Sequence, residues 1–336
     1  MHTTISAHEA RSGRALPAAL TGESAAVRHA RQAVETAHPG PLLFLADEGL
    51  EAGAVAGYLH AKTRAGQPFI TLDCADGDAD HLERMLLGSR PRAGSADLES
   101  VGSSSALLAA RKGTLFIDHL IDLPAIAQRR LARVLRDGEV RTNARERVRM
   151  AARVVAAAPT SLASDARDGR FRADLLRRFG AQQITLPALR MRPEDLPAIV
   201  QRLTADIAAG AHRTPPSFTQ PALTVLSAFQ WPGNIVELRT ALERILRDLS
   251  GPIVRQEDVL PTLPVEGMAA GLMTPLISLR EARRRFEREY IAAVLEQHQW
   301  RMSDAARTLG IERANLYRKT RQLGISRDET ITERAR

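Results

Sequence analysis

The stretch that decides the fold runs from Leu42 to Thr63 and reads LLFLADEGLEAGAVAGYLHAKT. Its first four residues are apolar, which predicts a buried strand, and the segment from Ala54 to Lys62 has the pattern of a helix. An acidic, glycine-containing turn joins the two. This order of strand, turn and helix is the setting of a P-loop, in which glycines and a lysine hold phosphate groups. The turn contains no lysine, so the stretch predicts the fold of a P-loop protein and leaves phosphate binding open.

The segments on either side extend this prediction to two domains. From Leu20 to about Gln183, apolar runs alternate with helical patterns, which predicts an α/β core with a parallel sheet covered by helices. Strand signals become rare between Leu186 and Leu263, where DLPAIVQRLTADIAAG and NIVELRTALERILRDL carry apolar residues at helical spacing. This part is predicted to be a small helical domain. The stretch LPTLPVEGMAAGLMTP then indicates a linker before a last helical unit.

Composition limits the class of protein. At 336 residues and 44% apolar, the chain can bury a sizeable core. Its single cysteine, Cys74, excludes a disulfide framework, and none of its nine histidines has a metal-ligand spacing, so no metal site is predicted. No leader or long apolar span is present, which predicts a cytoplasmic protein without a membrane contact. The net charge of +8 favours a polyanionic partner, although an arginine-rich composition can also reflect genomic base bias.

The last helical unit is predicted from SLREARRRFEREYIAAVLEQHQWRMSDAARTLGIERANLYRKTRQLGI. A long amphipathic helix, Leu279 to about Gln297, is followed by a short helix from Ser303 to Leu309, which the Ser303 hydroxyl can cap. Gly310 supplies a tight turn before a third helix from Glu312 to Leu323. This order predicts a helix-turn-helix. Its core is predicted to contain Ala305, Ala306, Leu309, Ile311, Leu316 and Leu323.

The open side of this unit is the predicted DNA contact. Arginine and asparagine can form paired hydrogen bonds to base edges. Between Ser278 and Ile325, eleven Lys/Arg against six Asp/Glu give a difference of +5 out of the total of +8, which weakens the base-bias explanation. The alternative is a solvated basic bundle. The predicted DNA-binding residues are Ser303, Arg313, Asn315, Tyr317, Arg318 and Lys319.

The same residues resemble the Fis-type DNA-binding domain that ends bacterial enhancer-binding proteins, the sigma-54-dependent transcription activators of the NtrC type. Five further segments resemble the AAA+ domain of that family, in the right order. They are LTGESAAV (opening segment), KGTLFIDHLIDLP (Walker B strand), GRFRADLLRRF (arginine-finger segment), PALRMRPEDLPAIV (start of the lid) and FQWPGNIVEL (the WPGN motif of the lid). The resemblance covers about residues 20–325 and implies a member without a receiver domain.

The resemblance also implies where the domains lie. The predicted boundaries are 1–19 for a disordered N-terminus, 20–183 for the AAA+ α/β subdomain, 184–265 for the helical lid, 266–277 for the linker, 278–325 for the helix-turn-helix and 326–336 for a tail.

The opening stretch departs from the GESGTGKE loop of the family. An ungapped overlay places Ala46, Gly49 and Glu51 at the three glycines and Ala52 at the lysine. The next residue, Gly53, has no side chain to help place Mg²⁺. The acidic side chains of the loop put negative charge where a triphosphate would lie, so repulsion replaces attraction. The comparison predicts that ATP and Mg²⁺ do not bind in the usual mode, and no cofactor is expected.

The other catalytic positions of the family are also altered. Asp118 stands at the Mg²⁺ partner of the Walker B strand, but His119 replaces the glutamate that activates water. A neutral imidazole can act as a base, although an ordinary residue at the end of a strand is the favoured interpretation. The sensor asparagine falls on Pro159 and the sensor arginine of the lid on Val236. These changes predict a degenerate AAA+ domain with no catalytic residues, which is not an enzyme.

Two further segments bear on partners. Arg172 and Arg178 match the two arginines that reach into the nucleotide site of a neighbouring protomer, and structural ion pairs are the alternative role. The interval LLGSRPRAGSADLESVGSSSALLAARKG contains no GAFTGA, the family's contact with sigma-54. Direct activation of sigma-54 polymerase is therefore not expected.

The leading hypothesis is a sequence-specific DNA-binding transcriptional regulator that has lost its ATPase. Its partners would be double-stranded promoter or enhancer DNA, further copies through the AAA+ domain and the helix-turn-helix, and RNA polymerase or an active AAA+ relative. It would act in the cytoplasm at the nucleoid. The alternatives are an ATP-dependent sigma-54 activator with atypical motifs, and a non-catalytic subunit of a mixed AAA+ ring. A signalling nucleotide in the altered pocket is neither supported nor excluded.

Overall fold

The chain forms two compact units, Met1–Gly267 and Met268–Arg336. A computed structural model describes residues 6–7, 15–75, 77–88, 98–110, 112–142, 146–263, 291, 294–295, 298, 300–309 and 313–323. No helix within these ranges is long and apolar enough to cross a bilayer.

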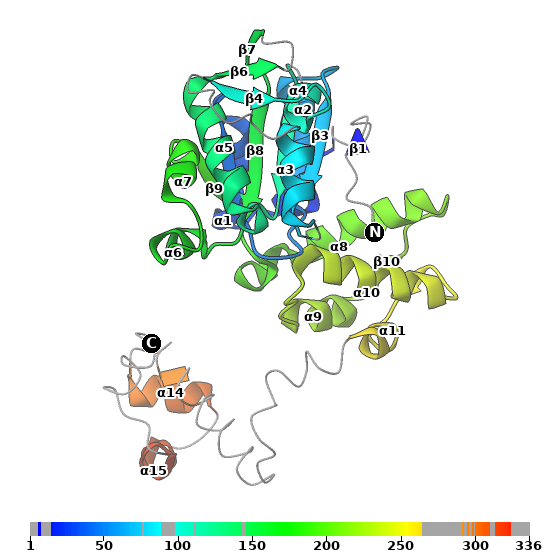
Figure 1. Cartoon of the computed structure of the whole chain (residues 1–336). Coiled ribbons are helices and arrows are strands. Elements are labelled where there is room, and N and C mark those ends of the chain that lie inside the picture. The colour runs from blue at the N-terminus through cyan, green and yellow to red at the C-terminus, as the bar shows by residue number, and fades with distance from the viewer. Residues whose placement is uncertain are drawn as a thin grey trace. The chain divides into compact units, whose positions relative to one another are not determined.

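The first unit is built on a six-stranded sheet in the order β1-β3-β5-β8-β2-β9 (Figure 1). All neighbouring strands are parallel except β1, which pairs antiparallel with β3. The predicted parallel α/β sheet is therefore confirmed. The strands are β1 (Ser6–Ala7), β2 (Leu42–Leu45), β3 (Phe69–Asp73), β5 (Thr114–Asp118), β8 (Arg153–Ala158) and β9 (Gln183–Thr185).

Two small sheets and a set of helices complete this unit. The small sheets comprise β4 (Glu99–Val101), β6 (Glu139–Thr142) and β7 (Arg147–Arg149), and β10 (Ser217–Phe218) with β11 (Ile253–Val254). The helices of the α/β part are α1 (Ala25–Glu35), α2 (Ala52–Thr63), α3 (Ala79–Leu87), α4 (Ala106–Ala109), α5 (Ala125–Asp137), α6 (Leu162–Arg167) and α7 (Ala173–Phe179). The helical lid contains α8 (Leu196–Gly210), α9 (Gln220–Ala228), α10 (Asn234–Asp248) and α11 (Gln256–Val259).

The apolar run of β2 explains why both faces of the sheet are covered. Side chains alternate between the faces of a strand. Leu42 and Phe44 pack in a cluster with residues of α1, α2 and the lid, whereas Leu43 packs in a second cluster with residues of α3, α5 and α7. A strand that is buried on both sides needs a continuous apolar sequence, which is what LLFL provides.

The lid is held together by its own apolar core. Trp231 is 1% exposed and donates a hydrogen bond from Nε1 to the carbonyl oxygen of Leu226 at 2.8 Å. Its ring packs edge-on against Phe229, with centroids 4.9 Å apart. Trp231 is thus a residue of the lid core.

The N-terminal segment is partly structured, so the prediction of disorder over residues 1–19 is wrong at these positions. Ser6–Ala7 form β1, and Ala18–Leu20 form a buried 3₁₀ turn that packs in the core. The short strand is specified by the free edge of β3, and its own sequence carries no strand pattern. Periodicity could not have revealed it.

The second unit contains the predicted helix-turn-helix pair. Helix α14 (Met302–Thr308) and helix α15 (Arg313–Leu323) pack on each other, with Ala305, Ala306 and Leu316 buried between them. Helix α14 begins one residue before Ser303 and has Arg301 at its N-cap, so the predicted capping role of Ser303 is wrong. Gly310, Ile311 and most of the predicted helix 279–297 lie outside the described residues.

Candidate functional site

The loop of residues 46–51 lies at the carboxyl edge of the parallel sheet, between β2 and α2. Open α/β sheets bind ligands at this edge, and backbone N–H groups at the start of a helix attract anions. Leu50 anchors the loop in the core at 1% exposure, and Glu51 adopts a left-handed conformation (φ 53°) just before α2. The predicted strand, turn and helix are thus all present in the expected order.

The loop is tied to the lid by neutral hydrogen bonds. The buried Asn234 side chain donates to the Glu48 carbonyl oxygen at 2.8 Å and accepts from the Leu189 amide at 3.0 Å. The amide of Val236 donates to the Gly49 carbonyl oxygen at 3.1 Å. The contact of Asn234 with the loop cannot be seen in the sequence because 186 residues separate it from Glu48.

Gly49 is required by this contact. Its φ is +75°, and a Cβ atom built on it would lie 2.1 Å from the carbonyl oxygen of Gly233. We expect Gly49→Ala to lower the free energy of unfolding by about 2–4 kcal/mol, through the positive φ and the displacement of the lid backbone. Chemical unfolding of both proteins measures this.

A matched control is Gly57→Ala in the middle of α2, where an added Cβ meets no atom within 4 Å. Because alanine is the better helix former, this variant should gain about 0.5–1 kcal/mol. Equal stabilities for the Gly49 variant and the wild type would show that the loop does not need this close approach.

Two arginines of the lid lie against the acidic side chains of the loop. Arg190 forms an ion pair with Asp47, with Nη2 and Oδ2 2.7 Å apart. Arg239 donates two hydrogen bonds to Glu51, at 3.1 and 3.2 Å. The sequence analysis missed both arginines because they follow their partners by 143 and 188 residues. The loop is therefore less repulsive to anions than its own sequence predicts.

Four of the residues at the altered catalytic positions, Ala52, Gly53, Pro159 and Val236, carry no charge. Ala52 is buried at the start of α2, and a Cβ on Gly53 would lie 3.2 Å from the Phe116 ring. Pro159 follows the last residue of β8, and Val236 is 49% exposed on α10. Positive charge reaches this loop from Arg190 and Arg239.

A second polar group lies at the ends of β3 and β5. His119 Nδ1 is 2.7 Å from Asp73 Oδ1, and the His119 amide donates to the Asp118 carboxylate at 3.0 Å. Burial opposes the charged imidazole, but the hydrogen bond to Asp73 and the negative charge of Asp118 outweigh it and raise the pKa of His119. Burial also raises the pKa of Asp118. With Nδ1–H held by Asp73, the Nε2 atom of a neutral ring is left to accept a proton. Asp73 was not singled out from the sequence.

The two arginine-finger-like residues lie near a basic cavity of about 650 Å³, which is lined in part by Arg129, Arg133 and Arg178. Arg172 donates two hydrogen bonds to Asp174 at 2.9 and 2.8 Å. Arg178 is exposed on α7. The structure thus pairs Arg172 within its own chain and presents Arg178 to the solvent.

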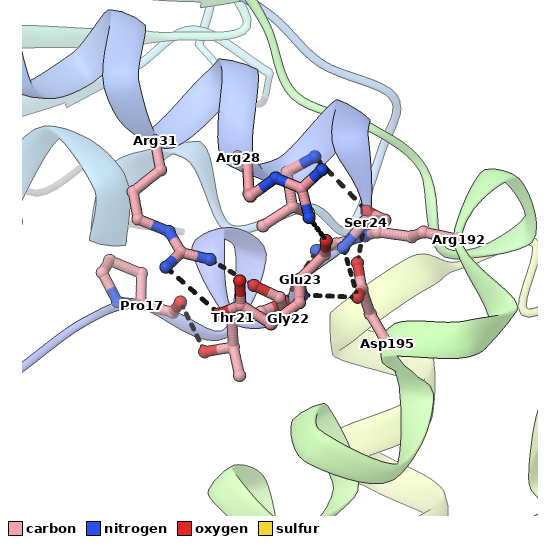
Figure 2. Close-up of polar contacts among 10 residues, drawn as sticks. Pro17, Thr21, Gly22, Glu23, Ser24, Arg28, Arg31, Arg192 and Asp195 are labelled. Carbon is pink, nitrogen blue, oxygen red and sulfur yellow. Dashed lines mark hydrogen bonds and ion pairs between the residues drawn. The ribbon is translucent and has the colours of Figure 1, made fainter.

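The start of the AAA+ core is joined to the start of the lid by a buried carboxylate (Figure 2). Asp195 accepts hydrogen bonds from the amides of Glu23 and Ser24, at 2.7 and 2.9 Å, and from the Ser24 hydroxyl at 2.5 Å. Arg192 is fully buried beside it and donates to the Thr21 carbonyl oxygen at 3.2 Å. Burial lowers the pKa of Arg192 to about 10. These contacts fix α8 against the core independently of the loop.

The predicted DNA-binding side chains other than Ser303 lie on α15, outside its buried side. Leu316 and Thr320 point into the core, whereas Arg313, Tyr317 and Arg318 are exposed. The Arg313 guanidinium lies 5.7 Å from the centroid of the Tyr317 ring. A basic face opposite a buried face is the arrangement that a recognition helix needs. Asn315 and Lys319 are half-buried at its margins, and Ser303 is exposed on α14.

A parallel α/β core with a helical lid and a helix-turn-helix unit defines an AAA+ regulator that binds DNA. Models of three known domains match the chain: the sigma-54 interaction domain over residues 20–185, the AAA+ ATPase lid domain over residues 190–269 and the Fis family of bacterial regulatory proteins over residues 282–323. The chain belongs to the family of sigma-54-dependent transcriptional regulators, the enhancer-binding proteins.

Individual relatives agree with this assignment. The transcriptional regulatory protein ZraR of Salmonella typhimurium is 32% identical over 327 residues, which are 93% of this chain and 72% of ZraR. The nitrogen assimilation regulatory protein NtrX of Azorhizobium caulinodans is 31% identical and covers 92% of this chain and 70% of that protein. The crystal structure of NtrX from Brucella abortus in complex with ATP has a TM-score of 0.70 at 29% identity and covers 94% of this chain and 71% of NtrX.

These findings correct two predictions. The Brucella abortus NtrX has been solved with ATP and with ADP, which contradicts the predictions that this chain takes no nucleotide cofactor and is not an enzyme. Those predictions considered the charge of the side chains within the loop only. The fold brings Arg190 and Arg239 to that loop from the lid, and no local motif records them.

Proposed function

We propose that this protein is an ATP-dependent regulator of sigma-54-dependent transcription, with nucleotide bound between the loop of residues 46–51 and the lid. The observation that carries the proposal is the likeness to the ATP complex of NtrX over 94% of the chain, at a TM-score of 0.70. The loop stands at the sheet edge where such ligands bind, and two lid arginines lie against it.

The helix-turn-helix unit is proposed to select promoter or enhancer DNA. Phosphate contacts from its basic side chains would supply affinity, and α15 would read base edges with Arg313, Asn315 and Arg318. Two copies would bind the two halves of a pseudo-palindromic site, acting at the nucleoid. Tyr317, Lys319 and Ser303 complete the proposed contact set.

The remaining family positions are assigned by the same reasoning. Asp118 would hold the Mg²⁺ that accompanies ATP, and Mg²⁺ would neutralise phosphate charge. His119, held by Asp73, would accept a proton from the attacking water. Arg172 and Arg178 would face the nucleotide of a neighbouring copy in an assembled ring. The polymerase contact would differ from that of relatives with a GAFTGA loop. The predicted domain boundaries from residue 20 onward are retained as part of the proposal.

Formation of the open promoter complex in vitro tests this function, because RNA synthesis itself consumes ATP as a substrate. Purified sigma-54 polymerase, a supercoiled template with the cognate site, and the full chain, without other nucleotides, should give an open complex in permanganate footprinting only when hydrolysable ATP is present. An open complex of equal amount without ATP, or with a non-hydrolysable analogue, would overturn the proposal.

A further inference from the structure

The cations nearest to the loop of residues 46–51 belong to the lid. We propose that Arg239 and Arg190 take the part of the missing loop lysine, by exchanging their carboxylate partners for the phosphates of a bound nucleotide. This inference rests on the proposed function and names the residues that hold its ligand.

Arg239 lies in the right place for this role. Its guanidinium meets the carboxylate of Glu51, the residue immediately before α2, so it lies at the N-terminal end of the helix that follows the loop. The Glu51 carboxylate is the anion that Arg239 binds at the N-terminal end of α2. Val236, three residues earlier on α10, lies one turn away on the same side of the helix and is apolar. Helix α10 therefore does carry a cation, Arg239, one turn beyond the position of the sensor arginine.

Arg190 approaches the opposite end of the loop. It is the middle residue of a short 3₁₀ turn, Leu189–Met191, and its Nη2 atom lies 2.7 Å from Asp47 Oδ2. The Leu189 amide next to it is held by Asn234, which also binds the loop backbone. The position of Arg190 is thus set by neutral hydrogen bonds that do not involve its charge.

The exchange is energetically allowed because both ion pairs are open to solvent. The side chains of Arg239 and Glu51 are 31% and 22% exposed, and those of Arg190 and Asp47 are 44% and 27% exposed. Pairs of this kind contribute little to stability. A guanidinium can bind phosphate with two parallel, charge-assisted hydrogen bonds, as Arg239 already binds Glu51, so the bonds that the exchange breaks are replaced by bonds of the same kind. The exchange therefore costs little.

The carboxylates set a limit on affinity. Asp47, Glu48 and Glu51 carry three negative charges against the two positive charges of Arg190 and Arg239, so the free loop is still acidic by one charge. Each carboxylate that loses its arginine to a phosphate repels that phosphate. Removing the charge of Glu51 should thus strengthen nucleotide binding, whereas removing the charge of Arg239 should weaken it.

Calorimetric titration of the full chain with MgATP tests these opposite signs. Arg239→Gln should raise the dissociation constant by about tenfold to a hundredfold, the range for losing a hydrogen-bonded charge. Glu51→Gln should lower it by at least about threefold. Arg244→Gln, an exposed position on the same helix, is the matched control and should leave it unchanged. Unfolding midpoints equal to that of the wild type show that the variants are folded.

The outcomes separate this inference from the proposed function. If Arg239→Gln and Arg190→Gln both bind MgATP with the dissociation constant of the wild type, the role of the lid arginines is overturned. Nucleotide binding by the protein would then still stand. Tighter binding by Arg239→Gln would also overturn it, because the ion pair would then obstruct the ligand. No binding by the wild type would overturn the proposed function itself.

Discussion

Replacing Arg130 with methionine is expected to lower the free energy of unfolding by about 3–5 kcal/mol. Arg130 is 3% exposed, and its guanidinium binds Glu83 at 2.8 Å and Glu99 at 2.7 Å, both of which are also buried. Methionine retains most of the volume but leaves two buried carboxylates without their cation. Urea unfolding followed by circular dichroism measures the loss.

Arg129→Met is the control, because Arg129 is the neighbouring residue on α5 and its side chain is exposed. A surface change of this kind should alter stability by no more than about 0.5 kcal/mol. Equal stability of the Arg130 and Arg129 variants would show that the buried ion cluster contributes nothing.

The cluster joins two elements near the interval in which family members carry the GAFTGA loop. Glu83 lies in α3, before this interval, and Glu99 lies in β4, within it. The amide of Gly102 donates to the Leu87 carbonyl oxygen at 2.8 Å, which is a second contact between the same two parts of the chain. Arg130 thus ties β4 to α3.

Removing residues 264–336 is expected to abolish sequence-specific DNA binding. The predicted recognition residues all lie in the second compact unit, and the first unit has a complete apolar core of its own. A mobility-shift titration with the cognate site should show no specific complex, whereas circular dichroism should show a folded core. Specific binding that persists in the truncated protein would place the DNA contact elsewhere.

A full-length variant sharpens this test. In α15, Arg318 donates to Asn315 Oδ1 at 2.7 Å, and both side chains are proposed to read bases. Asn315→Ala and Arg318→Ala should each reduce specific affinity by about tenfold to a hundredfold, the value of one paired base contact. Arg202→Ala, in the lid helix α8, should leave the affinity unchanged. A uniform loss on specific and random DNA would limit the two residues to phosphate contacts.

The elements with strong local patterns were predictable. The run LLFL predicted a buried strand, and the spacing of Ala305, Ala306 and Leu316 predicted a packed helix pair. The resemblance to enhancer-binding proteins rested on ordered motifs of this kind, and the comparisons confirm it.

The lid residues that contact the loop could not be predicted in this way. Arg190, Arg239 and Asn234 reach the loop only after the lid has folded onto the core. The absence of the lysine was visible in the sequence, but the two arginines that lie against the loop come from positions more than 140 residues away. The charge around a site depends on tertiary structure, and the prediction of an inactive domain considered only the residues of the motifs themselves.

Titration of the full-length protein with MgATP in a calorimeter is the measurement to make first. We expect saturable heat with a dissociation constant of about 100 μM or below, which corresponds to roughly −5.5 kcal/mol or a more favourable value. Saturation would establish that this protein binds nucleotide although its loop has no lysine. No heat at protein concentrations that reveal such affinity would contradict nucleotide binding by this protein.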